Sequence, residues 1–185
     1  MVISALEAAY ADNISDATCV DVGVEGSIRY ATVVILFGAA DLIPDRMPWL
    51  TPAGNLTVKK RSKTERNALF VAALGSTVLA TVKEGLAAGP SVDEFRVVVL
   101  RKDPGALKPA DFVAPIYIAR FRRAAMAGPW TTREPVASLL TAEGAMLTRR
   151  GAIGDVLPLD LSDHPETADL VETFRPLVLG KYLDT

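Results

Sequence analysis

A run of basic side chains between residues 59 and 66 is the part of the sequence that points most directly to chemistry. It borders a long apolar segment with a helical signature. The start of a helix favours anions, because its free backbone N–H groups and its dipole face outward there. Flanking cations would strengthen such a site for phosphate or a nucleic-acid backbone, and two later arginines would enlarge the patch if they lay nearby. The candidate anion-binding residues are Lys59, Lys60, Arg61, Lys63, Arg66, Arg120 and Arg122.

A solvated surface is the competing interpretation of these cations. Positive side chains beside a very apolar helix keep a protein soluble, and Glu65 can neutralise part of the patch. The sequence leaves both interpretations open.

The other reactive side chains do not form a catalytic set. His164 is the only histidine, so a multi-histidine metal site or a Ser-His-Asp triad is hard to assemble, and its place before Pro165 predicts a surface position at a helix start. Cys19 is the only cysteine, which excludes an internal disulfide and a thiolate zinc cluster; we expect it in the core or in a sheet. No glycine pair matches a nucleotide-binding loop. We therefore predict no catalytic residue, no metal site and no cofactor.

Two tryptophans, Trp49 and Trp130, sit beside prolines in segments with no regular pattern. Such side chains pack under a loop or stay exposed as anchors for a protein partner. They are the candidate partner-contact residues.

Composition narrows the class of protein. The chain has 185 residues, a hydrophobic fraction of 50% and a formal net charge of −2, so it can bury a real core and is not basic overall. The apolar surplus suggests an interface with a protein partner or a second copy. A single cysteine, and a first segment without the basic start and apolar core of a signal peptide, predict a cytoplasmic protein.

One long buried helix is expected to organise the fold. Ser62-Lys63-Thr64-Glu65 has the pattern of a capping box, and Gly89-Pro90 supplies a stop signal. Apolar side chains between these signals cover far more than one helical face, as in a helix surrounded by protein. Polar residues interrupt the run before it reaches about 18 apolar residues, so we expect no membrane span.

The remaining elements predict an α+β fold. A helix at 2–11, strands at 19–24, 28–37 and 56–60, the long helix, and strands at 94–101 and 112–122 give the order α-β-β-β-α-β-β. The sheet should be mixed or mainly antiparallel, with about five strands. A mainly helical third follows, with helices at about 134–143 and from 165, where Pro176 should kink or end the last helix, and a strand at 156–161. Residues 1–127 form the expected core domain, and residues 128–185 a C-terminal extension packed on it.

The element order resembles the core of the restriction-endonuclease-like family. That family places an acidic residue near its second strand and an acid-x-lysine on its third, where carboxylates hold a divalent metal and the lysine helps position the attacking water. Lys59 matches the lysine, Thr57 stands where the acid belongs, and Asp41 and Asp45 could supply carboxylates. The resemblance covers at most residues 1–101 and implies a degenerate nuclease-like core.

The sequence therefore favours a non-catalytic interaction or accessory subunit that oligomerises or binds a protein partner through apolar surface. The alternative is a nucleic-acid-binding or metal-dependent nuclease-like protein.

Overall fold

The long helix predicted from the sequence is the centre of the structure. The computed structural model describes residues 1–11, 16–102, 113–128 and 134–183. Helix α2 spans Lys63–Ala88, and the predicted capping box is confirmed: the Ser62 hydroxyl accepts from the Glu65 N–H, and the Glu65 carboxylate accepts from the Ser62 N–H at 2.7 Å. At the other end, the Gly89 N–H donates to the carbonyl of Gly85. Both ends of the helix are therefore fixed by local contacts.

The C-terminal end of α2 is also held by a cation from another element. The Arg123 guanidinium donates to the carbonyl oxygens of Leu86 at 3.0 Å, Gly89 at 2.7 Å and Val92 at 2.8 Å. A positive group is favourable at this end of a helix, because the free carbonyls carry the negative end of the dipole. Arg123 therefore joins the end of α2 to the end of strand β6.

The main sheet is mixed and five-stranded, as predicted. Its order is β1 (Asp16–Glu25), β2 (Ile28–Phe37), β5 (Glu94–Lys102), β6 (Val113–Arg122) and β7 (Glu143–Met146). Strands β2 and β5 are parallel, because α2 carries the chain back between them, and the other neighbours are antiparallel.

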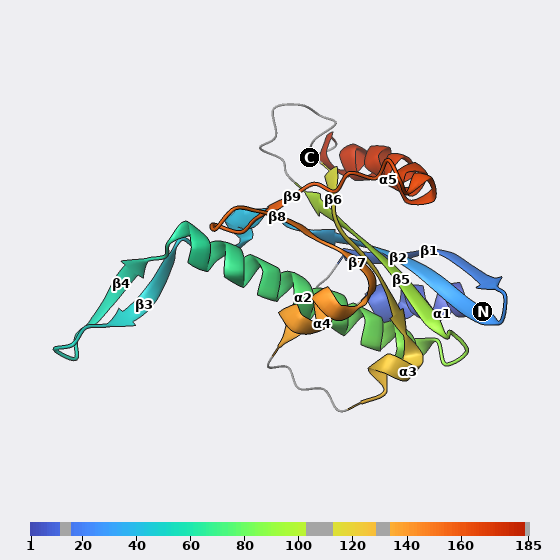
Figure 1. Ribbon diagram of the computed structural model, residues 1–185, viewed down its shortest axis with the longest axis horizontal. Coiled ribbons are helices and arrows are strands. Elements are labelled where there is room, and N and C mark those ends of the chain that lie inside the picture. Colours follow the sequence, from blue (N-terminus) through green and yellow to red (C-terminus); the bar gives the residue numbers. More distant parts are fainter. Residues whose placement is uncertain (12–15, 103–112, 129–133, 184–185) are drawn as a thin grey trace.

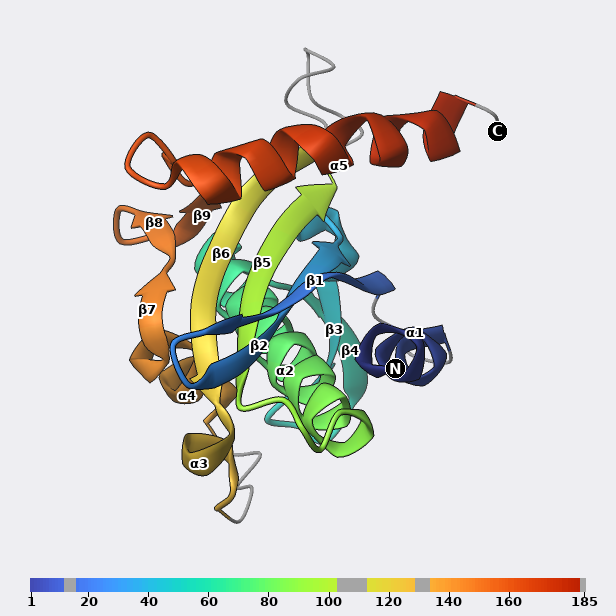
Figure 2. The same cartoon turned by 90° about the vertical axis from the view of Figure 1, so that its right-hand side faces the viewer.

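Helices cover the two faces of the sheet unequally. Helices α1 (Val2–Ala11), α2 and α4 (Pro135–Thr141) lie on one face, and α5 (Pro165–Leu183) crosses one end of the other (Figures 1 and 2). Side chains alternate accordingly along β5: Phe95 and Val97 belong to the large core against α2, whereas Val98 belongs to a smaller core under α5. Part of the second face therefore remains uncovered by α5 (Figure 2).

Helix α2 is long and apolar enough to cross a bilayer by length and composition alone. In the structure, 56% of its 18-residue apolar window is buried inside the protein. The helix contacts α1, α4 and the sheet, as the core helix of a globular domain does.

The predicted third strand is real but lies outside the main sheet. Strand β4 (Leu56–Lys60) pairs with β3 (Arg46–Leu50) in a separate two-stranded ribbon, and β3 is not among the strands predicted from the sequence. A short 3-10 helix, η1 (Ala40–Leu42), leads into this ribbon. The fifth strand of the main sheet is supplied instead by β7, beyond residue 127.

The C-terminal part packs on the core through several elements. Strand β7 pairs with β6, and Leu139 of α4 is fully buried in the large core. Helix α3 (Arg123–Met126) and the hairpin of β8 (Thr148–Arg150) and β9 (Asp155–Leu157) complete the structure. Helix α5 continues past Pro176, so of the two outcomes expected there, a kink or an end, the end is wrong; a proline removes only one backbone donor.

Close packing at Gly85 gives a test of this arrangement. A Cβ at this buried position of α2 would lie 2.6 Å from Cε1 of Phe95 and would also collide with the Tyr10 hydroxyl. Alanine normally stabilises a helix by about 1 kcal/mol relative to glycine. Here overpacking costs about 1–3 kcal/mol, so we expect Gly85→Ala to lower the free energy of unfolding measured in urea.

Ser76→Ala is the matched control, because Ser76 is exposed in the middle of the same helix. We expect its stability to change by less than about 0.5 kcal/mol. A Gly85→Ala protein more stable than wild type would contradict the packing of α1 and β5 against α2.

Candidate functional site

Strands β3 and β4 form an arm that projects from the body at the start of α2 (Figure 1). Five residue pairs hold its strands together, from Arg46 with Lys60 at the base to Leu50 with Leu56 near the tip. The tip is a tight turn in which the Thr51 N–H donates to the Asn55 carbonyl at 2.9 Å, and Gly54 adopts a φ of 81°. This left-handed backbone favours glycine. The arm, defined as residues 45–61, is therefore a regular β-hairpin.

Arg61 ties the base of the arm together. Its Nη1 donates to the carbonyl oxygens of Pro44 at 2.9 Å and Arg46 at 2.8 Å, and its backbone N–H donates to the Asp45 carbonyl at 2.7 Å. A guanidinium with several donors suits this bridging role. Arg61, one of the candidate anion-binding residues, is bonded to the protein's own backbone.

One face of the arm is apolar over most of its length. Antiparallel partners share a face, so Pro48 with Val58 and Leu50 with Leu56 form one apolar surface. Val58, Leu50 and Leu56 are 61%, 63% and 78% exposed. Three further exposed apolar side chains lie on η1, on the second turn of α2 and before β9: Leu42, Leu69 and Ile153. The elements η1 and β9 both contact α2, which begins at the base of the arm. We call these three residues the basal rim.

The other face of the arm carries Trp49. Its ring is 44% exposed, and the Lys59 ammonium lies 4.7 Å from the ring centroid. This cation–π contact holds Lys59 against the arm. The second predicted partner contact, Trp130, lies outside the described residues.

The start of α2 has less capacity for an external anion than the sequence suggested. Its Glu65 N–H is already bonded to Ser62, and the Glu65 carboxylate adds a negative charge there. Lys63 donates to Asp155 at 2.9 Å, and Asp155 also accepts from Asn67 at 2.8 Å. These contacts join the start of α2 to β9 and lower the pKa of Asp155. Cations and donors at the helix start are thus largely used within the protein.

Arg120 and Arg122 do not join the basic run. They lie near the end of β6, next to Arg123, which bonds to the far end of α2. The helix between the two groups is roughly 39 Å long at 1.5 Å per residue. Arg122 is also paired with Glu143, with 2.9 Å between Nε and Oε2. The seven predicted anion-binding residues therefore form two separate groups.

Cys19 is a buried side chain, as predicted. Its thiol faces the Asp21 carbonyl oxygen at 3.7 Å, and burial is the main cause that raises its pKa to about 11. A thiol of this kind is a poor nucleophile. His164 is exposed at the start of α5, also as predicted, but it lines a cavity over the main sheet.

The structure separates the residues that carried the resemblance to restriction-endonuclease-like proteins. Lys59 lies on the arm, outside the main sheet, and Thr57 beside it is exposed. Within the described ranges, no group of three or more histidine, cysteine or carboxylate side chains could hold a metal ion.

Comparisons with protein-family models, with curated proteins and with solved structures found no match to this chain. Any functional conclusion therefore rests on the geometry of the chain itself.

The apolar face of the arm was missed by the sequence reasoning, although a signal for it exists. Two five-residue segments, RMPWL and LTVKK, flank the turn-forming stretch Thr51–Asn55. Both segments mix apolar and polar residues, as an exposed ribbon does. The prolines at positions 48 and 52 hid this hairpin signal, because proline is tolerated in a strand only at an edge or bulge.

Proposed function

We propose that this chain is a non-catalytic interaction subunit that associates through its arm, and that the arm's principal partner is a second copy of the chain. The observation that carries this proposal is the apolar face of Pro48, Leu50, Leu56 and Val58 on a ribbon outside the protein body. A contiguous exposed apolar patch of this kind is typical of protein–protein contact surfaces.

The physics of an isolated ribbon supports an interaction role. A two-stranded hairpin on its own is marginally stable in water and needs packing against another element. Among the described elements, β3 and β4 make extensive contact only with each other. Burying Leu50, Leu56 and Val58 would remove apolar surface from water and stabilise the arm at the same time, at about 25 cal/mol per Å² buried.

Charge distribution favours a two-fold pair of antiparallel arms. The apolar face ends at the base in the cations Arg46 and Lys60, whereas the tip, residues 51–55, carries no charged side chain. With the arms antiparallel, the cations of one copy face the uncharged tip of the other, so like charges stay apart. Each tip would then reach towards the basal rim of the other copy. Parallel arms would instead bring four cations together.

The setting proposed for this association is the cytoplasm. The only cysteine, Cys19, cannot form a disulfide within the chain, so the fold does not depend on an oxidising compartment for such a bond.

Replacing Leu50 and Leu56 by serine tests the proposal. We expect the mass of the wild-type protein in light scattering to rise with concentration from 19.7 kDa towards twice that value, because association obeys mass action. The double variant should remain at the mass of one chain. Its stability should change by less than about 0.5 kcal/mol, because both side chains are exposed.

Val24→Ser is the matched control, since Val24 is 68% exposed but lies on β1. It should associate like wild type. Wild-type protein that keeps the mass of one chain at every concentration would contradict self-association, and equal association of the double variant would show that the arm is not the contact.

Nucleic-acid binding by the same arm is the second candidate. Residues 45–66 hold six cations and two carboxylates in a chain whose formal net charge is −2. A two-stranded ribbon also fits a groove of duplex DNA, and cations along it would neutralise phosphates.

Salt dependence of DNA binding distinguishes this candidate. If the arm binds DNA, replacing Arg46, Lys59 and Lys60 by alanine should weaken binding of a labelled duplex and reduce the slope of log K against log salt by about 3. Fluorescence anisotropy measures both quantities. The Leu50 and Leu56 double variant, which keeps these cations, is the control. Absence of wild-type binding at low salt would exclude the candidate.

A further inference from the structure

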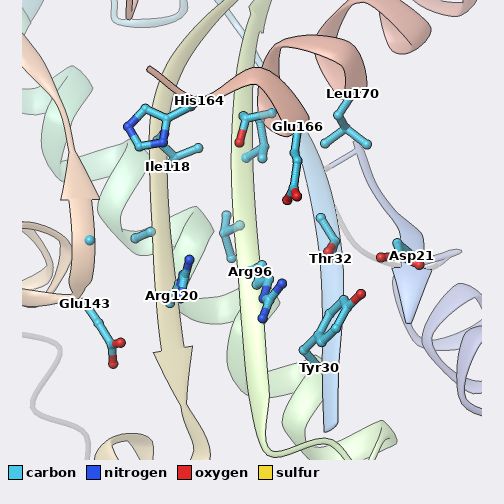
Figure 3. A pocket seen from close by; sticks show the side chains of 15 residues that line it. Asp21, Tyr30, Thr32, Arg96, Ile118, Arg120, Glu143, His164, Glu166 and Leu170 are labelled. Carbon is cyan, nitrogen blue, oxygen red and sulfur yellow. The ribbon is translucent and has the colours of Figure 1, made fainter. Parts of the chain in front are cut away.

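The second face of the main sheet, next to the start of α5, contains a cavity of about 430 Å³ (Figure 3). Side chains from the central strands form its floor, with Tyr30 and Thr32 on β2, Arg96 on β5 and Arg120 on β6. His164 and Glu166, at the start of α5, extend over this floor (Figure 3). The volume falls within the range of about 300–1,000 Å³ that is usual for small-molecule sites.

Two arginines lie directly opposite each other in the floor. Arg96 and Arg120 are cross-strand partners on neighbouring central strands, an arrangement in which like charges destabilise a sheet. Arg96 is compensated by close contacts: its Nε donates to Glu94 at 3.0 Å, it forms an ion pair with Glu25, and its guanidinium lies 3.8 Å from the centroid of the Tyr30 ring. On its other side, Arg120 has Glu143 as its cross-strand partner on β7.

Arg120 has no ion-pair partner among the described residues. The charge of Arg120 contributes to lowering the pKa of Glu25, but the ion-pair partner of Glu25 is Arg96. The other wall carboxylates are also engaged: Glu143 pairs with Arg122, and Asp21 accepts from the Tyr30 hydroxyl, which raises the pKa of Tyr30. Arg120 is therefore an exposed cation that lines the cavity and, although Glu143 lies opposite it on β7, forms no ion pair among the described residues.

Glu166 is the corresponding anion. It lies in the first turn of α5, where the helix dipole favours a carboxylate, and it forms no ion pair within the described part of the chain. Its carboxylate is directed towards the floor of the cavity (Figure 3). The lining of the cavity also includes the apolar side chains of Val98, Ile118 and Leu170.

We propose that this cavity binds a small zwitterion with an apolar side group, of the class of the apolar α-amino acids. Arg120 holds the carboxylate of the ligand, Glu166 holds its ammonium group, and the side group packs on Ile118 and Leu170. A simple anion would meet Asp21, Glu143 and Glu166 in the same walls, and a simple cation would meet the two arginines. A zwitterion satisfies both unpaired charges at once.

Leucine and its two monopolar analogues test the proposal by calorimetric titration. Isoamylamine is leucine without the carboxylate, and isocaproate is leucine without the ammonium group. We expect leucine to bind saturably and each analogue to bind at least about tenfold more weakly, because each loses one charge-assisted hydrogen bond.

Two single substitutions identify the charges. Arg120→Gln should weaken leucine and isocaproate but leave isoamylamine unchanged, and Glu166→Gln should weaken leucine and isoamylamine but leave isocaproate unchanged. Arg149→Gln is the control, because Arg149 is an exposed cation on β8 that does not line the cavity. Unfolding curves of all variants check that the fold is kept.

Three results would overturn the proposal: no saturable heat with leucine at its solubility limit, equal binding of leucine and its analogues, or wild-type binding by both cavity variants. Neither Arg120 nor Glu166 lies on the arm. The proposal is therefore independent of self-association and can fail or succeed separately.

Discussion

The burial of α2 against one face of the main sheet is the constraint on which the rest of the structure depends. Its apolar residues cover more than one side, so α1, α4 and the strands must all pack around it. Gly85 allows the close approach of Tyr10 and Phe95, and the two ends are fixed by Ser62 with Glu65 and by Arg123. Because α2 crosses between β2 and β5, it also makes these strands parallel and places both ends of the arm at one corner of the body.

Two surfaces remain exposed once this packing is complete, and they differ in chemistry. The arm presents an apolar face ending in Arg46 and Lys60, which suits association with another macromolecule. The second face of the main sheet presents Arg96 opposite Arg120 in a concave setting, which suits a small charged ligand. Both break a rule that stabilises isolated proteins, since one exposes large apolar side chains and the other places like charges opposite each other. Such local conflicts are expected where a protein interacts with something else.

The fold could be predicted from the sequence further than the site could. The capping box at Ser62, the stop at Gly89 and the β-branched run of β5 are local signals, and each element formed where the sequence placed it. To predict the arm from the sequence, one would need to know that β4 pairs with β3 and does not join the main sheet. This choice is set by tertiary packing rather than by local sequence pattern. Whether Arg120 and Arg122 lie near Lys59 depends on where β6 ends relative to α2, which the sequence does not show. Arg120 and Glu166 line the same cavity although they are 46 residues apart in the sequence. No short-range sequence pattern indicates that residues so far apart share a site.

Hydrogen exchange of the arm amides, followed at low and high protein concentration, tests the central claim most directly. If arms pair through their apolar faces, exchange in residues 46–50 and 56–60 should slow as concentration rises, because a docked ribbon opens less often. Amides in the middle of α2 should exchange at the same rate throughout, since they are already buried. Exchange in the arm that does not depend on concentration, in samples where light scattering shows association, would place the contact elsewhere and contradict the account.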